Sequence, residues 1–172
     1  MRVEPPADVE EPVTIHLLDH GRHTSLVLPS ERGAVRYTFG DWRWYAEHEV
    51  GPWRAFRALL TPSAATLGRY ELSGRDSDEA LSRLYIGVQH HHRLEVERAA
   101  VEELRADLDR RHAEAERHLF SPRYQLEFAS HPEPYHLFNN SNGKVAGWLE
   151  TLGCAVSGVP LRADWRLDTD PR

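Results

Sequence analysis

Ser141 is the first residue whose type and position suit covalent catalysis. It lies in the polar segment Asn139-Asn140-Ser141-Asn142, just before a stretch that is predicted to be helical. A serine at the start of a helix is close to free backbone N–H groups and to the positive end of the helix dipole, which stabilise negative charge on a reacting oxygen. Asn and Ser are also typical helix N-cap residues. Capping is therefore the competing interpretation of this segment.

His23 is the matching candidate for a general base. It follows Gly21-Arg22 and opens a β-rich run. Histidine changes its charge near neutral pH, and a neutral imidazole can take the proton that a serine hydroxyl loses during attack. The chain has 11 histidines. An ordinary polar residue at a strand end is therefore the competing interpretation.

A third polar group would be needed to orient the imidazole. Asp41 is the first candidate, because it ends the predicted strand that follows the histidine strand. Asp19 and His20, in the turn before His23, are its rivals. Asp41 could equally cap the helix that follows. His136, two residues before Phe138, could face the same cleft, although a position in the sheet is the simpler interpretation.

The predicted elements place these residues at the ends of strands and at the start of a helix. Residues 13–18, 23–28 and 35–39 are predicted strands, the first two forming a hairpin. Helices are predicted at 42–48, 53–60, 99–118 and 144–152, the last ending at Gly153, which suits a C-cap. Further strands are expected at 67–72, 93–97 and 135–138. Residues 78–92 are ambiguous, and residues 120–134, with three prolines, are predicted to be a loop.

Strands that come in runs, with helices between them, indicate an α+β fold with an antiparallel sheet. The 172 residues suit one domain. Residues 1–12 are predicted to be a disordered lead. Residues 13–172 are predicted to be a single domain with an irregular tail after residue 159.

The motifs together resemble a known family. They are Gly21-Arg22-His23-Thr24-Ser25-Leu26-Val27-Leu28-Pro29, then Phe39-Gly40-Asp41 with Tyr45, then Tyr135-His136-Leu137-Phe138-Asn139-Asn140-Ser141-Asn142, and Gly153. This pattern, over residues 13–156, resembles a bacterial family of uncharacterised proteins often met near urease genes. That family is similar to the circularly permuted papain-like fold of NlpC-type peptidases and lecithin–retinol acyltransferase. The histidine strand then comes first, and the nucleophile opens a helix late in the chain.

The resemblance implies a hydrolase or acyltransferase that attacks an amide or ester. The family pattern has cysteine followed by asparagine where this chain has Ser141-Asn142. Cys154 follows 13 residues later, nearly four helical turns away, and cannot replace it. Either the site works as a Ser–His pair, or the chain is an inactive relative that binds a ligand or partner protein through the old cleft.

No cofactor or metal site is predicted. The chain has no phosphate-binding glycine loop, no dinucleotide fingerprint and no His-Glu-x-x-His. The run His90-His91-His92 cannot direct three rings at one ion in regular structure. His112 and His118, six apart on a predicted helix, do not share a face. The aromatic residues Trp42, Trp44, Tyr45, Trp53 and Phe56 suit a core or, alternatively, a pocket for an acyl chain.

Charge and composition restrict the partners. Lys plus Arg number 21 and Asp plus Glu number 27, giving a net charge of −6. This acidity argues against nucleic acid and against an anionic membrane surface. The acidic, proline-rich start lacks the apolar segment of a signal peptide, and no apolar run is long enough to span a membrane. We therefore expect a cytoplasmic protein with a small-molecule, peptide or acyl substrate, and a protein partner as a further option.

Overall fold

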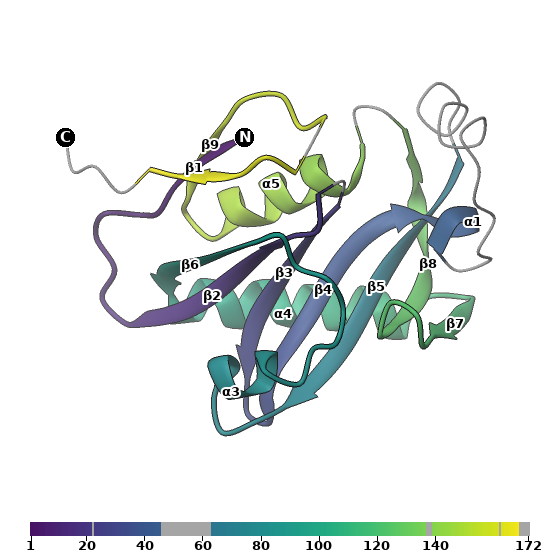
Figure 1. Cartoon of the computed structure of the whole chain (residues 1–172), viewed down its shortest axis with the longest axis horizontal. Coiled ribbons are helices and arrows are strands. Elements are labelled where there is room, and N and C mark those ends of the chain that lie inside the picture. Colours follow the sequence, from purple (N-terminus) through teal and green to yellow (C-terminus); the bar gives the residue numbers. More distant parts are fainter. Residues whose placement is uncertain (22, 46–62, 137–138, 162, 169–172) are drawn as a thin grey trace.

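The main sheet has seven antiparallel strands in the order β6-β2-β3-β4-β5-β8-β7 (Figure 1). The computed structural model covers residues 1–172 and describes all of them except 22, 46–62, 137–138, 162 and 169–172. The strands of this sheet are β2 (Pro12–Asp19), β3 (Thr24–Ser30), β4 (Gly33–Asp41), β5 (Ser63–Ser73), β6 (His90–Glu97), β7 (His118–Ser121) and β8 (Leu126–Tyr135). The predicted α+β class with an antiparallel sheet is confirmed.

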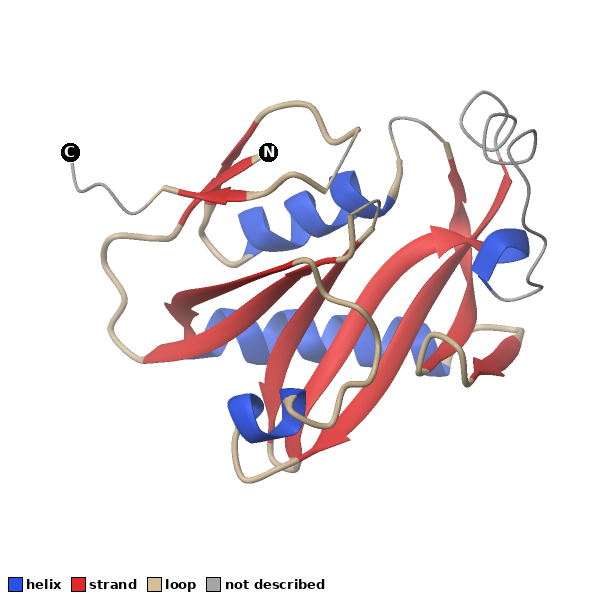
Figure 2. Ribbon diagram, viewed as in Figure 1, coloured by secondary structure: helices blue, strands red, loops and turns tan. Residues whose placement is uncertain are grey.

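Two helices cover one face of the sheet, and a short helix lies on the other (Figure 2). The described helices are α1 (Trp42–Tyr45), α3 (Ser77–Leu81), α4 (Arg98–Ala113) and α5 (Ser141–Thr151). Alternation along each strand sends Leu26 and Leu28 toward α4 and α5, and Val27 toward α3. No described helix is long and apolar enough to cross a membrane.

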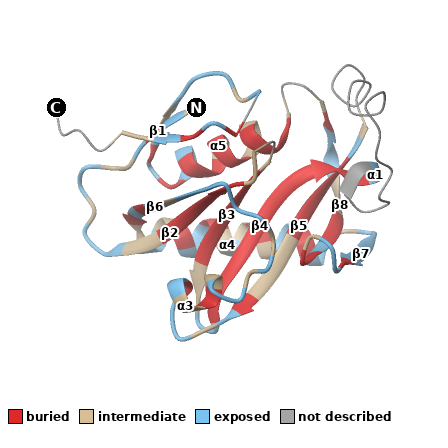
Figure 3. Ribbon diagram, viewed as in Figure 1, coloured by how far each residue is buried: buried red, intermediate tan, exposed pale blue. Residues whose placement is uncertain are grey.

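The central strand β4 is buried along its whole length (Figure 3). On the side of α4 and α5, its Val35, Tyr37 and Phe39 belong to the largest cluster of buried apolar side chains. The Tyr37 hydroxyl also donates to the Asp109 carboxylate of α4, at 2.5 Å. Helix α4 is therefore held on the sheet by apolar packing and by a partly buried polar contact.

The predicted loop at 120–134 is wrong. Its residues form β7 and most of β8, which pair antiparallel from His118↔Ala129 to Ser121↔Leu126. Of the three prolines that suggested a loop, Pro122 lies in the turn between the two strands. Pro132 and Pro134 lie beyond the stretch that pairs with β7, where an N–H donor is not needed on that side.

The long helix is shorter than predicted. Helix α4 ends at Ala113, five residues before the expected end at His118. Residues 114–117 have good helix propensity, but His118 pairs with β8. Pairing with the neighbouring strand of a hairpin overrides the local preference here.

Both ends of the chain contribute to the core, unlike the predicted lead and tail. Strand β1 (Arg2–Glu4) lies between β9 (Ala155–Ser157) and β10 (Arg166–Leu167) in a second, three-stranded sheet. Val3 is fully buried, and Trp165 is 3% exposed. These isolated apolar residues in polar segments belong to the same buried cluster as Val145 and Leu149 of α5. The small sheet lies beside α5 (Figure 1).

The sequence predicts an aromatic group that begins at Trp42, and the structure describes the side chain of Trp42 from this group. It is 3% exposed and packs against Leu126 and Phe128, with the Arg117 guanidinium 4.4 Å from its ring centre. This environment supports the core interpretation for Trp42. The side chains of Trp44 and Tyr45 and the helix predicted at 53–60 lie outside the described parts.

His16 is a fully buried histidine on the α3 side of the sheet. Its Nε2 hydrogen-bonds the Ser77 hydroxyl at 2.8 Å, and its Nδ1 hydrogen-bonds His91 Nε2 at 2.9 Å. Burial, and then the charge of His91, lower the pKa of His16 to about 4. The ring is therefore neutral in the folded protein at neutral pH.

We expect the free energy of unfolding to fall as the pH drops from about 6.5 to 4. In this window the unfolded chain protonates His16 and the folded chain does not, so stability rises with pH. The shift corresponds to about 3 kcal/mol. Urea unfolding at pH 7 and pH 5 should show a smaller pH dependence in His16→Gln. The exposed His90→Gln should behave as the parent; an unchanged dependence in His16→Gln would contradict this explanation.

Candidate functional site

Strand order and register bring the candidate residues to one end of the sheet (Figure 1). The start of β3 lies beside the end of β4, since Ser25 pairs with Thr38. The end of β8 lies beside the start of β5, where Ser63 pairs with Tyr135. Helix α5 begins six residues after β8 ends. The segments that carry His23, Asp41 and Ser141 therefore surround one end of the antiparallel sheet.

The N-cap of α5 is Asn140, and Ser141 is the first helical residue. The Asn140 side chain accepts hydrogen bonds from the N–H groups of Asn142 and Gly143, at 3.0 and 2.9 Å. The N–H of Ser141 hydrogen-bonds the Tyr135 hydroxyl. Capping thus belongs to Asn140 and not to Ser141. The N–H groups expected to stabilise a reacting oxygen, however, already have partners within the chain.

A buried hydrogen-bond chain joins the start of β3 to the start of α5. The Thr24 hydroxyl donates to Asn142 Oδ1 and accepts from Trp165 Nε1, both at 2.8 Å. All three side chains are at most 3% exposed. His23 directly precedes Thr24, and Ser141 directly precedes Asn142. Thr24 and Asn142 are 118 positions apart in the sequence and are hydrogen-bonded to each other. Each of the two candidate residues is the neighbour of one of them.

His23 lies in the hairpin turn before β3 and is half-buried. The N–H of His20 donates to the carbonyl of His23 at 2.9 Å, and Gly21 has a φ of +88°, which favours glycine. Within β3, alternation directs Thr24 toward α5 and Ser25 to the opposite face. A regular extension of β3 would direct His23 with Ser25, but His23 is outside the strand. Contact between its ring and the Ser141 hydroxyl therefore stays a prediction.

Asp41 ends β4 and is 7% exposed. Its carboxylate accepts a hydrogen bond from the Ser63 hydroxyl and lies close enough to Tyr135 to affect its titration. Burial, and then the negative charge of Asp41, raise the pKa of Tyr135 to about 12. The Tyr135 hydroxyl therefore keeps its proton at neutral pH. The orienting role predicted for Asp41 stays a prediction.

Tyr135 is a candidate residue that the sequence interpretation missed. Its hydroxyl oxygen accepts from the N–H of Ser141, and the hydroxyl keeps its own proton. A protonated phenol beside the first residue of α5 is suited to stabilising negative charge on a substrate oxygen. The available signal was a tyrosine six residues before the serine, at the start of the strand predicted at 135–138.

Two serine–histidine hydrogen bonds lie on the opposite face of the sheet. His20 Nε2 is 3.0 Å from the Ser25 hydroxyl, and its Nδ1 donates to the carbonyl of Gly87. His16 is bonded in the same way to Ser77. Ser25 is 2% exposed and Ser77 is 7% exposed. These pairs satisfy buried polar groups, and neither serine opens a helix of α5's length.

Asp19, His136 and Cys154 occupy other positions. Asp19 accepts from the N–H of Gly21 and so supports the hairpin turn. His136 forms an isolated bridge with Asn139 just before α5. Cys154 follows the other end of α5 and is 5% exposed, and burial raises its thiol pKa to about 11. A thiol with so high a pKa is a poor nucleophile at neutral pH, so Cys154 does not replace the missing cysteine.

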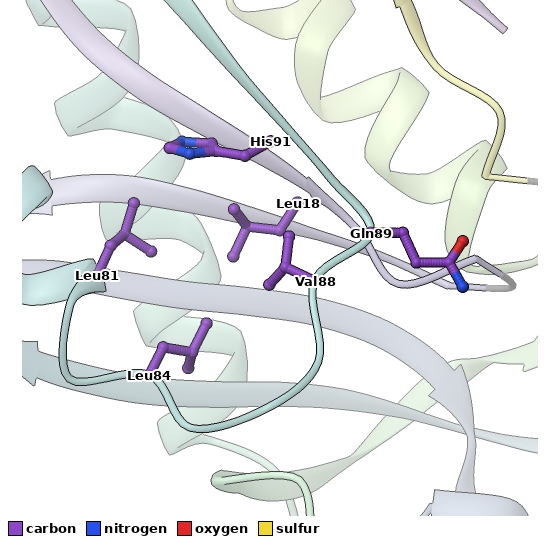
Figure 4. A pocket seen from close by; sticks show the side chains of 6 residues that line it. All are labelled: Leu18, Leu81, Leu84, Val88, Gln89 and His91. Atoms are coloured by element: carbon purple, nitrogen blue, oxygen red, sulfur yellow. The ribbon is translucent and has the colours of Figure 1, made fainter.

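Two hollows lie near these elements. A cavity of about 290 Å³ on the α3 side is lined by Leu18, Leu81, Leu84, Val88, Gln89 and His91 (Figure 4). A groove of about 410 Å³ between α4 and α5 reaches the first turn of α5 at Asn139, Gly143 and Lys144. The Lys144 ammonium pairs there with Glu133 at 2.6 Å. The groove is next to the candidate site, whereas the cavity is on the opposite face.

The sequence predicts that neither the run at residues 90–92 nor the pair His112 and His118 binds a metal ion. His90, His91 and His92 alternate along β6, so consecutive rings point to opposite faces, as the sequence predicts. His112 and His118 do come together, with ring centres 5.1 Å apart, because α4 ends between them. The expectation that His112 and His118 lie on different faces of one helix is therefore wrong.

Comparison of the chain with protein-family models, with curated proteins and with solved structures gives no match. The family resemblance therefore rests on the motifs alone.

We expect Thr24→Val to destabilise the protein by about 2–4 kcal/mol, because it leaves the buried Trp165 N–H and the Asn142 carbonyl oxygen without this partner. The side chains have similar shape, so lost hydrogen bonding accounts for the effect. Thr38→Val is the matched control. Its hydroxyl donates to the carbonyl of Thr24 at 3.0 Å, and we expect a loss of about 1 kcal/mol. Equal losses in urea unfolding would contradict the role assigned to Thr24.

Proposed function

We propose that this chain is a hydrolase or acyltransferase with a permuted papain-like fold, acting on an amide or ester through Ser141. His23 is the general base and Asp41 the group that orients it. The supporting observation is the buried hydrogen bond between Thr24 and Asn142, which holds the segment of His23 against the first turn of α5. The order of the elements, with the histidine strand first and the serine helix late, agrees with the permuted arrangement.

The proposed reaction proceeds through an acyl-enzyme. The Ser141 oxygen forms a bond to the substrate carbonyl carbon while its proton passes to His23. The imidazolium then returns that proton to the departing amine or alcohol as the carbon–heteroatom bond breaks. Water completes hydrolysis, or another nucleophile accepts the acyl group. Substrates of this kind are peptide-like amides or lipid-like acyl esters.

In this proposal Tyr135 supplies the donor that the helix N-terminus lacks. The N–H groups at the start of α5 are bonded within the chain, whereas the Tyr135 hydroxyl keeps its proton. A donor fixed before the substrate arrives stabilises the oxyanion without reorganising during the reaction.

The second candidate is an inactive relative that binds a ligand or a partner protein. Two observations favour it. Ser141 is 1% exposed, and the groove between α4 and α5 is lined by residues of α5's first turn without Ser141 itself. The charged groups Glu103, Arg111 and Lys144 line this groove and suit a polar peptide or small ligand.

A serine-reactive fluorophosphonate separates the two candidates. We expect covalent labelling of the parent protein at Ser141, loss of the label in Ser141→Ala, and labelling at least 10²-fold slower in His23→Ala. Mass spectrometry identifies the labelled residue.

Ser25→Ala and Ser77→Ala are the matched controls, since both serines already hydrogen-bond a histidine. Labelling that persists in Ser141→Ala and disappears in either control would move the site to the opposite face. An absence of labelling in the folded parent would favour the binding candidate.

Tyr135→Phe tests the oxyanion donor separately. We expect this variant to label about 10²-fold more slowly, because it loses the hydroxyl proton but keeps the ring. Far-ultraviolet circular dichroism should confirm that the fold is kept. A labelling rate equal to that of the parent would exclude Tyr135 from the reaction.

A further inference from the structure

The last turn of α4 meets the edge of the main sheet at a cluster of metal-ligating side chains. His112 belongs to α4, His118 opens β7, and Glu127 lies in β8. One ligand atom from each residue lies within 4.8 Å of the other two. The cluster is outside the candidate site, because Glu127 is near the start of β8 and Tyr135 is at its end.

The backbone register accounts for this cluster. His118 pairs with Ala129, so Glu127 is its diagonal neighbour on the same face of the two strands. Phe128, which lies between Glu127 and Ala129 in β8, points to the opposite face and packs in an apolar cluster with Trp42. Glu127 and His118 therefore share the face that α4 covers, and α4 adds His112 from its last turn.

Both imidazoles are oriented by backbone carbonyls. His112 Nε2 donates to the carbonyl of Glu127 at 3.0 Å, and His118 Nε2 donates to that of Ala115 at 3.1 Å. A carbonyl can only accept, so each ring carries its proton on Nε2 and, when neutral, keeps a lone pair on Nδ1. Histidine ligands of metal ions are typically fixed in this way by a partner on the second nitrogen.

The third side chain of the cluster, that of Glu127, lies near the Nδ1 atom of His118. Its Nδ1 is 4.0 Å from a Glu127 carboxylate oxygen. Burial lowers the pKa of His112, which favours the neutral form that a metal ion requires. Arg69, which pairs with Glu127 in the register of β5 and β8, forms an ion pair with Asp109 at 2.6 Å, so its charge is partly compensated.

We propose that His112, His118 and Glu127 bind one divalent transition-metal ion, for which Zn²⁺ is the best match. Two imidazole nitrogens and one carboxylate form a common zinc ligand set, with water in the fourth position. Tetrahedral zinc needs ligand atoms about 3.3 Å apart. The side chains of His118 and Glu127, 34% and 50% exposed, have room to close that distance.

Zinc bound here would tie the edge of the sheet to α4. Strand β7 has four residues, pairs with β8, and exposes Leu119 and Phe120. Its first residue would share an ion with the helix and with the neighbouring strand. Because the ion binds the folded chain, zinc should also raise the thermal stability.

Zinc titration of the full chain against a chromophoric chelator tests this inference. We expect the parent to bind Zn²⁺ at this site and to unfold at a higher temperature with zinc than without it. Affinity should fall at least tenfold in His118→Ala and in Glu127→Gln, and the zinc-dependent rise in unfolding temperature should disappear. Mg²⁺, which prefers oxygen ligands, should give no such rise.

His90→Ala is the matched control, because it removes an exposed histidine from the run on β6. It should bind zinc as the parent does. Circular dichroism of both ligand variants without zinc checks that they are folded. The inference is overturned if the parent binds no zinc, if folded Glu127→Gln binds it as tightly as the parent, or if the loss occurs in His90→Ala instead.

Discussion

The position of α5 on the sheet depends on the buried hydroxyl of Thr24. This one group donates to the first turn of α5 and accepts from Trp165, so it connects the second strand of the hairpin, the late helix and the C-terminal segment. Because Thr24, Asn142 and Trp165 are buried, a shift of any one of these segments would leave a polar group unsatisfied, which costs more than the hydrogen bond contributes. Apolar packing alone would tolerate a sliding helix; this hydrogen-bond chain fixes its register.

The sequence predicted well the parts of the fold that depend on local patterns. Alternation at residues 35–39 identified β4, and Gly21 identified the hairpin turn, where its φ is +88°. Gly153, with a φ of +84°, marked the end of α5. Each of these signals is complete within a few residues. The prediction failed where pairing with another segment decides the outcome, as at β7, β8 and the end of α4.

The same distinction applies to the candidate site. That Ser141 opens a helix followed from its neighbours, but Asn140 rather than Ser141 turned out to be the cap, because their types are equally suitable. The contacts of Thr24 with Asn142 and Trp165 span more than 110 residues and leave no local pattern. Tyr135 was assigned to a strand from its neighbours, and only the packed structure brings its hydroxyl to Ser141. Local patterns thus identify the segments of a site, whereas the contacts inside it need the fold.

The polar content of this end of the sheet favours a function for it. Thr24, Asp41, Tyr135, Ser141 and Asn142 are all at most 9% exposed. Burying a hydroxyl or a carboxylate costs free energy that its hydrogen bonds only partly recover. The opposite face shows that this fold can bury polar groups elsewhere, as Arg36 and His16 do. Among the described residues at the α5 end, a serine, a protonated phenol and a carboxylate lie around the start of a helix of several turns, and the proposed acyl transfer is built on this arrangement together with His23.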